Sequence, residues 1–173
     1  LWLAALEDRG EASELAYLPD LAQMEWLVHR AHLAPDALSF DFNALQAVNP
    51  AQQGALCFVL HPSCALLSSD FPVAQIWRMH QGEAAVPPSI DWDAVPERLL
   101  LWRQSLSQFE IAVKLKECAA GEHQFLNDLA SGETFMRAAS NALAIDAALD
   151  LQALLLDLVS DGVIAGFRLP TDA

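Results

Sequence analysis

The chain has 173 residues and a formal net charge of −14, with acidic residues in excess in both halves. This length allows one large or two small domains, and 54% hydrophobic with 18% charged residues is typical of a globular protein. Nucleic acids and anionic membranes attract Lys- and Arg-rich surfaces, so the charge argues against both as main partners. The three cysteines, an odd number without metal-knuckle spacing, indicate a reducing cytoplasm, and no export or membrane segment is visible.

The first half of the chain is predicted to be mainly helical. Proline and aspartate mark its helix boundaries, and apolar residues recur at the spacing of one helix face. Because the sequence opens at Leu1 inside a helical pattern, we expect a longer protein with a further N-terminal part. In chain order we expect a helical pattern over 1–34, with a helix start signal at Pro19 and Asp20 and an end at Pro35. A short helix over 41–48, extended runs over 56–60 and 64–68, and a helix from an Asp70 N-cap and Pro72 to a stop at Gly82 are expected to follow.

A proline-rich stretch separates this part from the rest. We place a linker at residues 87–95, between a domain over 1–86 and a second over 96–170. Apolar and polar residues alternate from Gln108 to Lys116, which predicts a strand buried on one face. The second domain is expected to hold a hairpin of strands 98–104 and 108–116 with its turn at 105–107, helices over 118–130, 134–142 and 150–161, and an edge strand over 163–169.

The predicted fold class is α+β, with a mainly helical N-terminal portion and a C-terminal winged-helix-like domain, in which a β-hairpin precedes three helices. Winged helices are usually associated with reading DNA. The last helix here carries no Lys or Arg and is expected to expose Gln152, Asp157, Ser160 and Asp161. A phosphate backbone would be repelled by that face, so the sequence favours a protein or peptide partner over DNA.

Three short motifs carry a resemblance to a known family. They are Leu18-Pro19-Asp20 with Glu25-Trp26, the bend His61-Pro62-Ser63, and Phe71-Pro72-Val73 with Trp77. Over residues 17–169 the chain resembles a bacterial two-domain family named for a DNA-binding domain. That family is similar to the accessory subunits of methanobactin-type peptide modification, which pair with multinuclear non-haem iron enzymes.

The resemblance implies a cytoplasmic, non-enzymatic accessory or regulatory protein that binds a partner enzyme of the multinuclear iron class and its precursor peptide. The alternative is a transcriptional regulator that binds DNA. In the family, the segment behind the DNA-binding name is N-terminal, and most of it would lie before Leu1. A DNA-binding role would therefore rest on residues outside this chain.

Few residues point to catalysis or metal binding. His61 with Cys64, and His29 with His32, have the spacing of half a metal site, but neither pair has a matching partner pair, and a structural role is favoured. Glu25, on a largely apolar helix face, is interpreted as an ion-paired or surface residue rather than a catalytic acid. We therefore predict no enzyme activity, no catalytic residue, no cofactor and no metal.

The hairpin offers the best candidates for partner binding. Its second strand could accept a peptide by strand addition, or the hairpin could simply complete a small core, and both roles stay open. Trp26 and Trp77 are expected in the N-terminal core, and Trp92 and Trp102 at the surface. The predicted partner-binding residues are Arg98, Trp102, Arg103, Glu110, Lys114 and Gln152.

Overall fold

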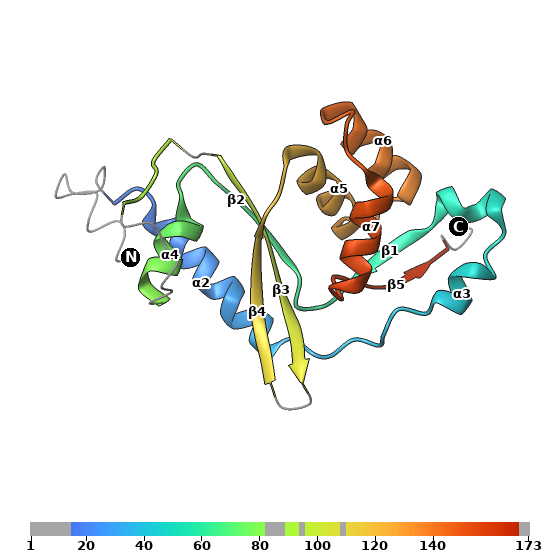
Figure 1. The fold of residues 1–173 in the computed structure, drawn as a ribbon, viewed down its shortest axis with the longest axis horizontal. Coiled ribbons are helices and arrows are strands. Elements are labelled where there is room, and N and C mark those ends of the chain that lie inside the picture. Colours follow the sequence, from blue (N-terminus) through green and yellow to red (C-terminus); the bar gives the residue numbers. More distant parts are fainter. Residues whose placement is uncertain (1–14, 82–88, 94–95, 108–109, 170–173) are drawn as a thin grey trace.

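The computed structural model of the chain describes residues 15–81, 89–93, 96–107 and 110–169. Over these ranges the protein is α+β, with six α-helices, one 3-10 helix and two small antiparallel sheets (Figure 1). Among the helices described, none is both long and apolar enough to cross a lipid bilayer. Residues 1–14 of the predicted helical stretch, residues 87, 88, 94 and 95 of the predicted linker, and the predicted stop at Gly82 lie outside the described residues.

The predicted helices and strands are confirmed wherever the chain is described, with ends that differ by a few residues. The predicted turn at 105–107 is wrong, because β3 stays extended and pairs with β4 as far as Ser107. The helices are α2 (Leu18–Leu33), α3 (Phe42–Gln46), η1 (Pro50–Ala55), α4 (Val73–Gln81), α5 (Ala120–Ala130), α6 (Phe135–Ile145) and α7 (Leu151–Ser160), and the strands are β1 (Cys57–Leu60), β2 (Ala65–Ser69), β3 (Glu97–Ser107), β4 (Glu110–Glu117) and β5 (Ile164–Arg168).

The helices of the C-terminal third begin and end at strong local signals. The side chains of Thr134 and Asp150 accept hydrogen bonds from amides in the first turns of α6 and α7. Helices α5 and α7 end at Gly132 and Gly162, whose φ angles of 79° and 73° are readily adopted only by glycine. Short-range chemistry therefore sets these boundaries.

Helix α4 begins at a cap supplied by another part of the chain. The Ala74 amide donates to Oε2 of Glu97 at 2.9 Å, so the cap is not the predicted Asp70. Glu97 lies at the start of β3 and is buried. Burial raises the pKa of Glu97, and the backbone hydrogen bonds that it accepts oppose that shift only in part. This contact fixes α4 against β3.

A three-stranded sheet in the order β2-β3-β4 lies between two groups of helices (Figure 1). Leu99 and Leu101 pack with α2 and α4 on one face, and Leu100 and Trp102 pack with α5 and α7 on the other. Strand β3 is therefore buried on both sides, which explains why residues 99–102 form a continuous apolar run instead of an alternating one.

The two hydrophobic clusters each combine residues from before and after the predicted linker. Met24 packs in one cluster with Leu99, and Phe58 packs in the other with Phe125. The second sheet also joins distant segments, since β1 pairs with β5 in antiparallel fashion. The two faces of the central sheet thus separate the clusters, and the division of the chain at residues 87–95 stays a prediction.

Helix α2 buries the apolar face that the sequence predicts. Met24 and Ala31, seven residues apart, are its buried residues, and Trp26 lies on the other side with 60% of its surface exposed. The prediction that Trp26 packs in the core is therefore wrong, whereas Trp77 on α4 does pack against that cluster. Trp92 is 52% exposed, as predicted.

Candidate functional site

Strand β4 presents an open edge. It is the outermost strand of the sheet formed by the described strands β2, β3 and β4. Directly after β4, the Cys118 amide donates to the carbonyl of Arg98 at 2.7 Å, which continues the register by one pair beyond Leu99 and Glu117. Because bonded and non-bonded pairs alternate along an antiparallel ladder, Val113 and Leu115 direct their N–H and C=O groups away from β3. These backbone groups are therefore placed for an incoming strand.

A groove of about 420 Å³ lies beside this edge, on the face covered by α2 and α4. Its floor includes Val113 of β4. One wall is a stripe of α2 with the spacing of a single helix face, and the other is formed by two residues one turn apart on α4. The wall residues are Glu25, Val28, His29 and His32 from α2, and Trp77 and Gln81 from α4.

The opposite face of β4 carries two lysines. Lys114 faces Trp102 in the register, and Lys116 forms an ion pair of 2.6 Å with Glu122 of α5. Partial burial alone would lower the pKa of Lys116, but the hydrogen bond and charge of Glu122 outweigh it, so that pKa is raised. A strand added to β4 would thus have the groove on one face of the sheet. On the other face it would meet Lys114 and Lys116, the second of which is already paired with Glu122.

The structure separates the predicted partner-binding residues. Trp102 is buried, with 6% of its surface exposed, and its Nε1 donates to the carbonyl of Asp161 at 3.1 Å. The expected exposure of Trp102 is therefore wrong, because α7 packs on that face of β3. Gln152 is exposed at the opposite end of α7, and the backbone of Glu110 pairs with Ser107 next to the end of the hairpin.

Arg103 points to the other face of β3 from Arg98 and Lys114. Its side chain is 7% exposed, donates to the carbonyls of His32 and Ala34 at 3.2 Å and 2.7 Å, and forms an ion pair with Asp36. Arg103 therefore anchors the extended segment that follows α2 and has few groups left for a partner.

The cations of the hairpin are divided between the two faces of the sheet. Alternation places Arg103 on the α2–α4 face and Arg98, Lys114 and Lys116 on the α5–α7 face. Most of the other cations near the sheet and α6 have carboxylate partners. The remaining ion pairs in the described part of the chain are Arg78–Glu117, Lys116–Glu122 and Arg137–Glu133.

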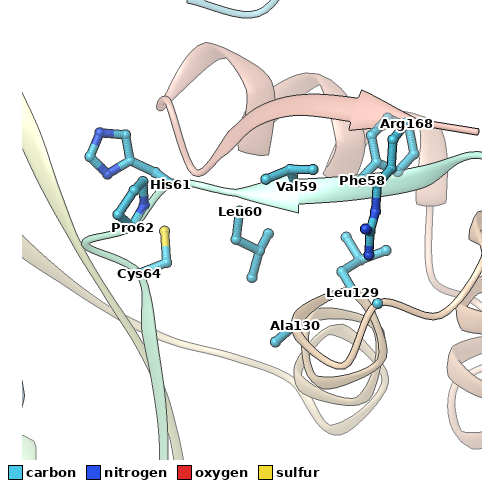
Figure 2. A pocket seen from close by; sticks show the side chains of 10 residues that line it. Phe58, Val59, Leu60, His61, Pro62, Cys64, Leu129, Ala130 and Arg168 are labelled. Atoms are coloured by element: carbon cyan, nitrogen blue, oxygen red, sulfur yellow. The ribbon is translucent and has the colours of Figure 1, made fainter. Parts of the chain in front are cut away.

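A second hollow, of about 450 Å³, lies between the β1–β5 sheet and the C-terminal end of α5 (Figure 2). His61, Pro62 and Cys64 line one end, and Arg168 lines the other beside Leu129. These groups include a thiol and an imidazole, the pair used by cysteine nucleophiles.

The side chains that line this hollow support a bend in the chain and are not arranged for catalysis. Burial raises the pKa of Cys64 to about 12, so its thiol stays protonated at neutral pH and is a poor nucleophile. Burial and the charge of Arg103 lower the pKa of His61. Nδ1 of His61 lies 2.8 Å from Oγ of Ser63 and accepts from the Ser63 amide at 3.1 Å. His61 thus stabilises the bend, as predicted.

His29, His32 and Glu25 are exposed on α2, which agrees with their predicted surface role. The part of the chain that the structure describes holds no group of three or more His, Cys, Asp or Glu side chains suited to a metal ion. The sequence predicted a histidine pair and a separate acid at these positions and did not predict the groove that they line. The signal available was the 25, 28, 29, 32 spacing along one helix face.

Comparison of the chain with protein-family models, with curated proteins and with solved structures finds no match.

Proposed function

We propose that this protein is a non-enzymatic, cytoplasmic accessory protein that binds an extended peptide along the edge of β4 and presents it to a partner enzyme. In this proposal β3, β4, α5, α6 and α7 act as a winged-helix-like peptide-recognition unit. The partner enzyme belongs to the multinuclear iron class that the family resemblance implies.

The observation that carries the proposal is the open edge of β4. Unpaired strand edges bind extended peptides through backbone hydrogen bonds, which supply affinity without requiring a particular sequence. Val113 and Leu115 direct their backbone groups outward, and side-chain environments on both faces of β4 could supply specificity.

The charge of the molecule supports a peptide over nucleic acid. The chain carries a net charge of −14, and α7, the helix that would read DNA in a winged helix, exposes Gln152, Asp157 and Ser160. Several cations are already held by carboxylates on the protein. Such a surface repels phosphates and attracts basic peptides.

Two substitutions at one position test the edge. Proline at residue 113 removes an outward N–H without removing a ladder bond, whereas alanine keeps that N–H. A display library of random twelve-residue peptides is selected on the purified chain, and the enriched peptides are measured by fluorescence anisotropy. Val113→Pro should weaken binding at least about tenfold and Val113→Ala only about twofold, since backbone pairing supplies most of the affinity.

Three outcomes would overturn the proposal. Selection could yield no binder, or the binders could tolerate Val113→Pro as well as Val113→Ala. The third outcome is salt-sensitive retardation of duplex DNA at about 100–150 mM salt, which would favour a transcriptional regulator instead. Co-purification with an iron-dependent enzyme encoded beside this chain tests the partner separately.

A further inference from the structure

We infer that the groove between α2 and α4 receives a Lys or Arg side chain of the peptide that pairs with β4. This inference rests on the proposed function, because it assigns a side-chain preference to the same edge.

The position of the groove follows from strand geometry. Residues directly opposite each other on neighbouring strands point their side chains to the same face of the sheet. Val113 lines the groove, so the peptide residue beside Val113 would point into the same space. Peptide residues two positions away would point to this face as well, and their immediate neighbours would face Lys114 and Lys116.

The lining of the groove favours a cation. Glu25 contributes its carboxylate, and the described lining residues include neither Lys nor Arg. Trp77 provides a half-buried aromatic wall, and cations bind favourably over indole rings. The volume of about 420 Å³ accommodates a long side chain with its methylene groups along Val28 and Val113 and its charged end beside Glu25.

Other side chains fit less well. A peptide carboxylate would share the groove with Glu25, and like charges repel each other. A large aliphatic group would remove water from Glu25 and the two histidines without offering them hydrogen bonds. The opposite face of β4 has the reverse preference, because Lys114 and Lys116 lie there. The edge is therefore expected to prefer basic residues at alternate positions of the peptide.

The test compares matched peptides and matched variants of the whole chain. An enriched peptide is synthesised with Arg, Met or Glu at the position that selection identifies as basic. Arg should bind about threefold to twentyfold tighter than Met, the combined effect of an exposed ion pair and a cation–π contact. Glu should bind more weakly than Met.

Glu25→Gln and Glu133→Gln make the same charge change at two places. Glu25 lines the groove, and Glu133 precedes α6, which lies among the C-terminal helices (Figure 1). Glu25→Gln should weaken the Arg peptide about twofold to fivefold and leave the Met peptide unchanged. Glu133→Gln should change neither peptide, because its charge lies away from the groove.

The outcomes separate the two proposals. If peptides bind, are lost in Val113→Pro and show no preference for Lys or Arg, the inference about the groove is wrong and the peptide-binding function stands. The same holds if the Arg preference survives Glu25→Gln unchanged. If no peptide binds, or if binding ignores Val113→Pro, both proposals fall.

Discussion

The two faces of the central sheet are built alike and differ in the polar group that each buries. On one face Leu99 and Leu101 pack with α2 and α4, and on the other Leu100 and Trp102 pack with α5 and α7. The first group of helices is fixed by a buried acid, the cap Glu97. The second group buries His123 on α5, beside Glu122, whose carboxylate is paired with Lys116. Neutral forms are easier to bury than charged ones, so Glu97 and His123 should change the stability with pH in opposite directions.

The largest effect is expected from truncating β3 toward either face. Leu99→Ala and Leu100→Ala should each lower the free energy of unfolding by about 2–5 kcal/mol, since both side chains are completely or almost completely buried. Because one strand serves both faces, each substitution should shift a single transition. Urea denaturation followed by circular dichroism and tryptophan fluorescence measures this.

Leu156→Ala on α7 is the control for this pair. Leu156 is 57% exposed, so its truncation should cost no more than about 0.5 kcal/mol. Two separate transitions, one sensitive to Leu99→Ala and the other to Leu100→Ala, would show that the two faces unfold independently.

The next effect compares ion pairs on opposite faces of β4. The Lys116–Glu122 pair buries its carboxylate, with a side-chain exposure of 10% for Glu122, whereas the Arg78–Glu117 pair leaves its carboxylate 61% exposed. Lys116→Met should cost about 1–3 kcal/mol, because it leaves a buried carboxylate without its partner. Arg78→Met should cost less than about 1 kcal/mol. Equal losses by thermal denaturation would contradict this difference.

Local chemistry explains how much of the fold could be predicted. The starts of α6 and α7 follow from the caps Thr134 and Asp150, and the ends of α5 and α7 follow from the positive φ angles of Gly132 and Gly162. Pairings between distant segments carry no such signal, and the sequence did not indicate that β2 joins the hairpin or that β1 pairs with β5. The cap from Glu97 was missed for the same reason.

The candidate site was predicted only in part, for a related reason. The hairpin, and a second strand with an edge that could accept a peptide, were predicted from the alternation of apolar and polar residues over 108–116. The groove requires α2, α4 and β4 to meet, and these segments are far apart in sequence. Exposure of tryptophans was also mispredicted for Trp26 and Trp102, because it depends on which helix covers which face. The amino-acid composition does not indicate which helix covers which face of the sheet.

A smaller effect is expected at Glu97, on the α2–α4 side. Its pKa is raised, so folding favours the protonated carboxyl; that contribution is full below about pH 4.5 and is lost as pH rises through the higher pKa of the folded state. Glu97→Gln retains an acceptor for the Ala74 amide and cannot ionise. The melting temperature of this variant should therefore gain on the wild type as pH rises from about 4.5 to 7.

Glu97→Ala is the matched change. It removes the acceptor and should cost about 1 kcal/mol, the usual value of a helix cap, at low pH as well as at neutral pH. A wild-type protein that becomes more stable relative to Glu97→Gln as pH rises would show that the ionised carboxylate is the favoured form, contrary to its burial.

The smallest effect is expected at His123, on the α5 side, with the opposite sign. Burial and the charge of Arg98 lower the pKa of His123, and the charge of Glu122 opposes this shift only in part. Nε2 of His123 is buried and has no hydrogen-bond partner among the described residues. Folding thus favours the neutral ring; this stability is full above about pH 6.5 and is lost as pH falls through that value toward the lower pKa of the folded state. His123→Gln keeps an acceptor for Asn127 and should lie within about 1 kcal/mol of the wild type at pH 7.5.

Acidification then distinguishes His123 from the surface histidines. Melting temperatures measured from pH 7.5 to 5.5 should fall less for His123→Gln than for the wild type, and His32→Gln, at an exposed residue, should follow the wild type. If His32→Gln gave the same protection as His123→Gln, the acid response would belong to the net charge of the molecule. If neither variant reduced the fall in melting temperature, protonation of His123 would not destabilise the fold, and the two faces of the sheet would not differ in their response to pH.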